Sequence, residues 1–324
     1  MIAFVVRRLL RLVPILLAVS FLSMFIISLA PGDYLTALRA DPQISQGTVE
    51  RMRREFGLDR PWYVQYVLWL ERAVLHGDLG ESFSFRVPVS ALIAERVANT
   101  LLLALTSSVF AWGIALPLGI AAGAYRDTWI DRLGSGIAFL GVSVPRVLLA
   151  LLVLYVSVGS GLFPAGGMKS AATYDLLSPW GKALDVLWHL IPPAFVMGVS
   201  GLAEVTRQMR GHLLDVLGAD FVRTARAKGL PERTVILRHA ARNALNPLIT
   251  LFGFTLARLL STSLIVEVTM SWPGLGSLTL EAIRRQDLFV VMATLVMASV
   301  LLVIGNLVAD VLLAASDPRI KAIA

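Results

Sequence analysis

Five charged side chains lie in or near long apolar stretches of the sequence, where a charge needs a specific partner. They are Arg146, Glu204, Arg258, Glu267 and Asp310. A charge at the centre of a lipid bilayer is costly, so it should face a helix bundle or a water-filled cavity. Arg258, midway along its stretch, can bind a carboxylate on a path or form an internal ion pair, and both remain open. Glu267 and Asp310 lie near the ends of their stretches, where we expect them to reach water.

The sequence lacks the patterns of common catalytic and metal sites. It has no H-E-x-x-H and no G-x-S-x-G, since Gly198-Val-Ser-Gly201 is one residue short. It contains no cysteine, which excludes disulfides and thiolate metal sites. Its one Gly-Lys pair, Gly181-Lys182, lacks the upstream glycine and the following hydroxyl of a phosphate-binding loop. We therefore predict no catalytic residue, metal site, cofactor or ATP site in this chain.

The polar segment 207–242 has the most regular pattern of the chain. One apolar helical face consists of Leu214, Leu217, Phe221 and Ala225. Other faces carry Asp220, Arg223, Arg226 and Lys228. Gly229 predicts a helix end, and Pro231 suits the start of a second helix. Such an amphipathic helix can lie on lipid or dock in a groove of another protein, and periodicity does not choose between the two.

The elements that would position these residues are long apolar helices. Of the 324 residues, 56% are hydrophobic and 16% are charged, which is typical of membrane proteins. A membrane-spanning helix needs about 20 apolar residues. We predict an all-α integral membrane protein with six spans, near residues 9–29, 99–122, 133–158, 187–205, 245–268 and 288–313. Within the second span, Gly119 and Gly123 form a small-xxx-small pattern that is typical of close helix contacts.

The distribution of basic residues predicts the orientation of these spans. Arginine and lysine collect at the start of the chain, in the segment 207–242 and near the C-terminus. Positive charges favour the cytoplasmic side, so we expect both termini in the cytoplasm. The same distribution argues against a nucleic-acid partner, although the net charge is +7. The first apolar stretch resembles a signal peptide, but Pro31 would follow the cleavage point, and we favour an uncleaved helix.

The segment 31–98 should lie outside the membrane as a structured extracytoplasmic region. A short charged helix is expected from Thr48, as its N-cap, to the stop at Gly57. A second, amphipathic helix over 61–75 carries aromatic residues suited to a membrane interface. We therefore divide the chain into a first transmembrane helix (1–30), this extracytoplasmic region (31–98) and a five-helix core (99–324).

Several short motifs occur in an order that resembles a known family. Within the polar segment these are Phe221-Val-Arg-Thr-Ala-Arg-Ala-Lys-Gly-Leu-Pro and Arg238-His-Ala-Ala-Arg-Asn-Ala-Leu-Asn-Pro. Elsewhere the motifs are Arg7-Arg8-Leu9-Leu10, Ala30-Pro-Gly-Asp33, Gly57-Leu-Asp-Arg-Pro61, Gly77-Asp-Leu-Gly80, Ser271-Trp-Pro-Gly-Leu-Gly276 and Asp317-Pro-Arg-Ile320. Together they resemble the permease subunits of ABC importers, in the dipeptide/oligopeptide/nickel branch. Arg223 stands where the general EAA motif has glutamate, as is usual for the peptide branch, and Arg258 stands where the family often has a small residue.

The resemblance implies a type I importer permease that forms half of a translocation path for short peptides. It places ATPase coupling in the segment 207–242, at Leu217, Asp220, Phe221, Arg223, Thr224, Ala225, Arg226, Ala227, Lys228 and Gly229. It places a path or gate at Arg258, Glu267, Trp272, Pro273 and Gly274. In this interpretation 271–276 is a tight turn with an aromatic anchor before the last span.

The partners implied by the resemblance are a second homologous permease, two ATP-binding subunits or domains and an extracytoplasmic substrate-binding protein. The expected location is a bacterial or archaeal cytoplasmic membrane, with the lipid bilayer as surroundings. Nickel chelates, glutathione and oligosaccharides remain alternative substrates. A secondary transporter or channel is a less favoured alternative, because we find no repeat between the two halves and the segment 207–242 would have no role.

Overall fold

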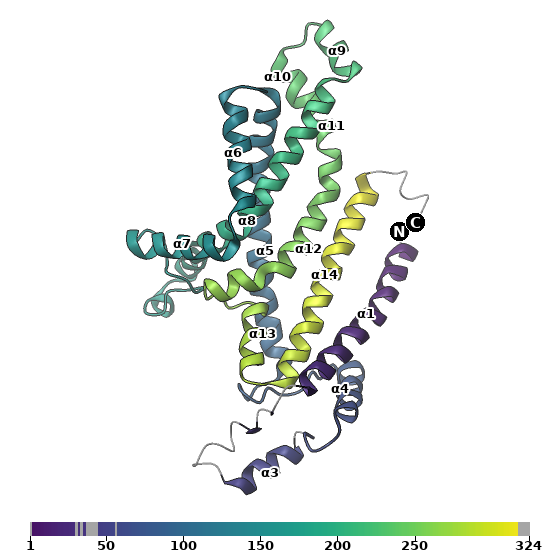
Figure 1. The fold of residues 1–324 in the computed structure, drawn as a ribbon, viewed down its shortest axis with the longest axis vertical. Helices are drawn as coiled ribbons and strands as arrows, with labels where there is room; N and C mark the ends of the chain where they lie inside the picture. Colours follow the sequence, from purple (N-terminus) through teal and green to yellow (C-terminus); the bar gives the residue numbers. More distant parts are fainter. Residues whose placement is uncertain (1, 30–31, 33–34, 37–44, 56, 317–324) are drawn as a thin grey trace. The chain divides into compact units, whose positions relative to one another are not determined.

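The computed structural model describes residues 2–29, 32, 35–36, 45–55 and 57–316, and its regular elements are helices (Figure 1). The chain divides into two compact units. Unit 1 consists of Met1–Thr100 and Pro273–Val303, and unit 2 of Leu101–Trp272 and Ile304–Ala324. The predicted all-α architecture is confirmed.

Continuous helices cover five of the predicted spans, and the third is broken. The continuous ones are α1 (Ile2–Ser28), α5 (Val89–Ala124), α8 (Pro179–Leu217), α12 (Asn246–Thr269) and α14 (Leu288–Ser316). By length and composition, α5, α8 and the Leu288–Val308 part of α14 can each cross a membrane. A shorter apolar stretch, Val13–Ser28, belongs to α1.

The predicted third span over 133–158 is present as a broken pair of helices that together are long and apolar enough to cross a membrane. The segment forms α6 (Trp129–Ser143) and α7 (Arg146–Ser160), which are bent by 105° relative to each other (Figure 1). Proline has no backbone N–H and disfavours the helical conformation of the residue before it. Val144, which precedes Pro145, is accordingly extended, with φ −84° and ψ 122°.

In unit 2, α8 is the helix against which α6, α7 and α12 pack. The predicted close contact of the small-residue pattern is confirmed in this unit. A Cβ added at Gly119 would lie 2.7 Å from Cβ of Met209 and 2.8 Å from the carbonyl oxygen of Thr206 on α8. One added at Gly123 would lie 3.2 Å from the carbonyl oxygen of Arg210. The two glycines therefore allow α5 to approach the backbone of α8.

In unit 1, the described part of the segment 31–98 is folded around two helices. The charged helix α3 (Gln46–Glu55) is capped by Ser45, whose Oγ accepts a hydrogen bond from the backbone N–H of Thr48 at 3.2 Å. The prediction that Thr48 is the cap was therefore wrong by about one helical turn. The expected stop at Gly57 is confirmed by its φ of +67°. The amphipathic helix is α4 (Trp62–His76).

The described part of the segment 31–98 packs against α1 and the start of α14 within unit 1. Its core consists of Met24, Tyr66, Trp69, Phe83, Leu288 and Met292. Fully buried Asp287 precedes α14 and accepts hydrogen bonds from Oγ of Ser82 at 2.6 Å and the backbone N–H of Ser84 at 3.0 Å. These contacts attach the chain near residue 83 to the start of α14.

Candidate functional site

The segment 207–242 leaves α8 and forms several short helices. These are α9 (Asp220–Ala227), α10 (Glu232–Thr234), a π-helix η2 (Val235–Ala241) and α11 (Arg242–Ala244). They lie at the same end of unit 2 as the turn between α5 and α6 (Figure 1). The predicted order of helix, Gly-Leu-Pro turn and helix is confirmed. A break at Gly218–Ala219, where Ala219 is extended, separates α8 from α9.

This break changes which face of α9 is buried. Val222 is 0% exposed and Ala225 is 5% exposed, and both belong to a core that includes Met209 and Leu213 of α8 and Val235 of η2. Phe221 is 45% exposed. The prediction that Phe221 continues the apolar face of Leu214 and Leu217 was therefore wrong, because the helix restarts at Asp220 with a different phase. The aromatic side chain of Phe221 is therefore exposed on the outer side of α9.

An ion pair closes the turn that follows α9. Nη2 of Arg226 lies 2.6 Å from Oε1 of Glu232, and Nε lies 3.2 Å from Oε2. The hydrogen bond and charge of Arg226 hold the pKa of Glu232 below its ordinary value of 4.5, and Glu232 raises the pKa of Arg226. Between them Gly229 adopts φ +75° and donates its N–H to the carbonyl oxygen of Arg226 at 2.9 Å. The left-handed conformation explains why glycine stands there.

Leu217 ends α8 and packs against the same core, whereas the other remaining candidates lie on the outer side of α9 or directly after it. Arg223 lies 3.5 Å from Asp220, an exposed pair, and Oγ1 of Thr224 donates to the carbonyl oxygen of Asp220 at 2.9 Å. Ala227 and Lys228 are exposed. Because α9 is attached through Val222 and Ala225 while these residues face outward, it has the form of a supported docking helix.

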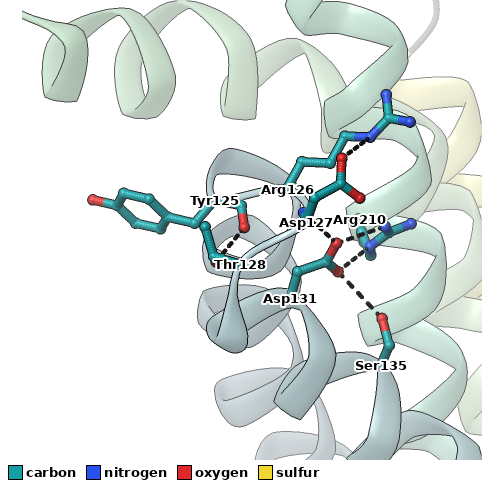
Figure 2. Close-up of polar contacts among 7 residues, drawn as sticks. All are labelled: Tyr125, Arg126, Asp127, Thr128, Asp131, Ser135 and Arg210. Atoms are coloured by element: carbon teal, nitrogen blue, oxygen red, sulfur yellow. Dashed lines mark hydrogen bonds and ion pairs between the residues drawn. The ribbon is translucent and has the colours of Figure 1, made fainter.

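A second ion pair anchors the neighbouring turn to α8 (Figure 2). Nε of Arg210 lies 2.6 Å from Oδ1 of Asp131, and Nη2 lies 2.9 Å from Oδ2. The same carboxylate accepts the backbone N–H of Asp127 at 3.0 Å and the hydroxyl of Ser135 at 3.3 Å. Sequence reasoning missed Asp131. The available signal was the pair of acids, Asp127 and Asp131, in a stretch bounded by two arginines that follows α5.

The five predicted path residues do not form one cluster. Arg258 forms an ion pair with Glu204 of α8, so the internal ion pair that the sequence left open is present. Glu267 lies nine residues further along α12, which is about 13 Å along a helix. It is 0% exposed and has polar contacts, so our expectation that it reaches water was wrong.

The predicted turn before the last span is present and is followed by an additional helix, α13 (Leu275–Arg284). Trp272 is fully buried in a core with Leu259, Val266 and Met270, and its backbone N–H donates to the carbonyl oxygen of Glu267 at 2.8 Å. This confirms the aromatic anchor. In unit 1, the carbonyl oxygen of Pro273 accepts from Nδ2 of Asn99 at 2.8 Å, and Gly274 precedes α13 in an extended conformation.

The polar residues that the structure describes contain no group of three or more histidine or acidic side chains that can hold a metal ion. The described site consists of α9, whose inner face is buried and whose outer face is exposed, and of two ion pairs.

Comparison with known proteins places most of the chain in one family. Residues 115–322 match the binding-protein-dependent transport system inner membrane component, and residues 1–104 match the corresponding N-terminal component. The oligopeptide transport system permease protein AppB of Bacillus subtilis (strain 168) is 42% identical over 99% of this chain and 100% of its own length. The glutathione transport system permease protein GsiC of Salmonella paratyphi A is 37% identical, with 99% of both chains covered. The dipeptide transport system permease protein DppB of Escherichia coli K12 is 33% identical, again over 99% of both.

Among solved structures, an inward-facing methionine ABC transporter, MetNI, has a similar fold. The TM-score is 0.56 at 19% identity, over 70% of this chain and 97% of that one. This likeness supports the type I permease fold.

Proposed function

Because the chain belongs to the family of binding-protein-dependent transport system inner membrane components, as a permease subunit of an ABC importer, we propose that it imports short peptides. The support is the function of its relatives, two of which are an oligopeptide permease and a dipeptide permease. Glutathione, itself a small peptide, is the second candidate, because the glutathione permease is 37% identical.

The coupling role is carried by one observation, which is the exposure of Phe221 on a helix whose opposite face is buried. We propose that the outer side of α9 docks in a groove of an ATP-binding subunit. Val222 and Ala225 attach α9 to α8, so a displacement of the docked helix is transmitted to α8. The ion pair of Arg226 with Glu232 and the turn at Gly229 keep the helix rigid during this displacement.

The proposed assembly contains a second homologous permease, two ATP-binding subunits and an extracytoplasmic binding protein. ATP hydrolysis belongs to the partner subunits, because the sequence carries no phosphate-binding loop. The chain lies in the bacterial or archaeal cytoplasmic membrane with both termini inside. Residues 1–30 form the first span, 31–98 the outer region and 99–324 the core.

The proposed path has two parts with different roles. Arg258, whose side chain is 44% exposed, faces the path. Buried Glu267 and Trp272 fix the turn before α13, with Pro273 and Gly274 completing it as a gate. Substrate affinity comes from the binding protein, so the path itself binds weakly and releases substrate on the inner side.

Two substitutions test the coupling role in the complete complex, reconstituted into liposomes with its binding protein. Phe221→Ser removes the exposed aromatic contact, and Gly229→Val strains a left-handed turn where an added Cβ meets no atom within 4 Å. We expect normal insertion of the chain, with loss of peptide uptake and of substrate-stimulated ATP hydrolysis. The control is Gly211→Ala, in helical α8, where an added Cβ also meets nothing within 4 Å.

Uptake that persists in both variants without ATP hydrolysis would overturn the coupling role and favour a channel or secondary transporter. Loss of uptake in the control to the same extent would show that the effect is not specific to α9.

A further inference from the structure

Charged and polar side chains gather where α7, α8 and α12 meet in unit 2. Arg146 begins α7, Ser200 and Glu204 belong to α8, and Arg258 lies near the middle of the 24-residue α12. Nη2 of Arg146 donates to Oγ of Ser200 at 3.1 Å. Glu204 pairs with Arg258 through Oε2 and accepts from Nε2 of Gln208 through Oε1 at 3.2 Å.

The charges in this cluster do not balance. It holds two guanidinium groups and one carboxylate, and Glu204 is engaged by Arg258 and Gln208. Arg146 forms no ion pair within the described part of the chain, and its side-chain hydrogen bond goes to a neutral hydroxyl. The charge of Arg258 acts on Arg146 unfavourably. A guanidinium has five N–H donors in a planar fork that matches a carboxylate, and most of those on Arg146 remain available.

The position of the cluster indicates what can neutralise the unpaired charge of Arg146. Helices α7, α8 and α12 contribute to predicted spans, and Arg146 stands directly after the 105° bend. An unpaired guanidinium in a span is too costly to face lipid, so it faces water or a partner surface. The side chains of Arg258 and Glu204 are 44% and 30% exposed, and Arg146 is partly buried, so the cluster is accessible from outside unit 2.

We propose that Arg146 is an anion-binding position on the translocation path, which receives the C-terminal carboxylate of a peptide substrate. This assignment rests on the proposed function. Ser200 orients the guanidinium of Arg146. Glu204 pairs with Arg258, so Arg146 is the guanidinium of this cluster that has no carboxylate partner. A single half-exposed cation gives a weak contact, as a path that must release its substrate requires. Arg146 thus favours peptides with a free C-terminus over capped ones.

The test compares uptake of two peptides of the same sequence, one with a free C-terminal carboxylate and one amidated, by the complete complex with its binding protein. The uptake of the free peptide is divided by the uptake of the amidated one, and this ratio in a variant is divided by the same ratio in the wild type to give a double ratio. Any preference of the binding protein is common to both and cancels. For Arg146→Gln we expect this double ratio to fall about fivefold, the size of one charge-assisted hydrogen bond in a half-exposed site.

Three further variants sharpen the result. Arg146→Lys keeps the charge and should keep most of the preference. Glu204→Gln frees Arg258 and should raise the double ratio above one, so it tests the proposal even where Arg146→Gln fails to assemble. Arg126→Gln, at an exposed arginine in the turn between α5 and α6, is the matched control and should leave the double ratio at one.

Each outcome has one meaning. Uptake of both peptides with a double ratio of one in Arg146→Gln and Glu204→Gln would overturn the anion site and leave the peptide importer in place. Weakened association with the second permease at an unchanged double ratio would also overturn it, and would identify the cluster as a subunit contact. Failure of the wild-type complex to import either peptide would instead contradict the proposed substrate.

Discussion

At the scale of single residues, two arginines of the segment 207–242 bind carboxylates in different surroundings. Arg210 pairs with Asp131, which is 5% exposed and also receives bonds from Asp127 and Ser135. Arg226 pairs with Glu232, and both side chains are about half exposed. Removing one member of a buried pair leaves an uncompensated charge, whereas exposed pairs contribute little. The first pair should therefore matter for folding, and the second for the local geometry of the turn.

Asp131→Asn should lower the free energy of unfolding in detergent by about 3 kcal/mol, the size expected when a buried pair loses one partner. Combined with Arg210→Gln, it should cost less than the sum of the two single changes, because both remove one interaction. The control is Arg223→Gln at an exposed pair, for which we expect less than about 0.5 kcal/mol. Equal effects of Asp131→Asn and Arg223→Gln would contradict this account.

The pair of Arg226 and Glu232 gives a pH dependence with a defined sign. The folded pKa of Glu232 lies below its ordinary value of 4.5, so the folded state binds the proton less tightly. The stabilisation is therefore present above 4.5 and is lost as the pH falls through the folded pKa. Protection of the amides of residues 226–235 from hydrogen exchange, corrected for intrinsic rates, should hold from pH 7 to about pH 5 and decline below that.

Glu232→Gln should reduce this protection between about pH 5 and pH 7, where the wild-type carboxylate is charged, and should remove its acid decline. An identical acid decline in the variant and the wild type would show that another group is responsible.

At the scale of elements, the approach of α5 to α8 depends on glycines at particular positions. Gly119 lies against the backbone of α8, whereas a Cβ added at Gly113 on the same helix meets no atom within 4 Å. We expect Gly119→Ala to lower the free energy of unfolding by about 1–3 kcal/mol through overpacking. Gly113→Ala should be neutral or stabilising by up to about 1 kcal/mol, because alanine is the better helix former. Equal effects of the two changes would contradict the close contact.

At the scale of the whole molecule, orientation in the membrane can be measured directly because the chain has no cysteine. Single cysteines replace Lys228 in the segment 207–242 and Asp175 in the loop before α8, both exposed. In intact cells, a membrane-impermeant maleimide should label the position of Asp175 and should reach that of Lys228 only after permeabilisation. The reverse pattern would place the segment 207–242 outside the cell and would contradict its proposed role in ATPase coupling. Wild-type chain, which has no thiol, is the control for background labelling.

The sequence by itself determined the class, the family and most of the elements, because these depend on local or repeated features. The length of the apolar stretches predicted the helices, and the ordered motifs predicted the permease family that the comparisons confirm. Gly229 was identified as a helix end because its left-handed conformation is one that glycine itself favours. These properties need no knowledge of distant neighbours.

Only the tertiary structure decided which proline bends a helix, which face of α9 is buried and which charged residues form pairs. Pro117 lies within the continuous helix α5, while Pro145 marks a 105° bend, so residue type did not distinguish them. Phe221 is exposed because α9 restarts after a break that periodicity did not predict. Arg258 meets Glu204 across 54 residues of sequence. Pairings of this kind follow from the packing of helices that are distant in the chain, which a one-dimensional pattern does not contain.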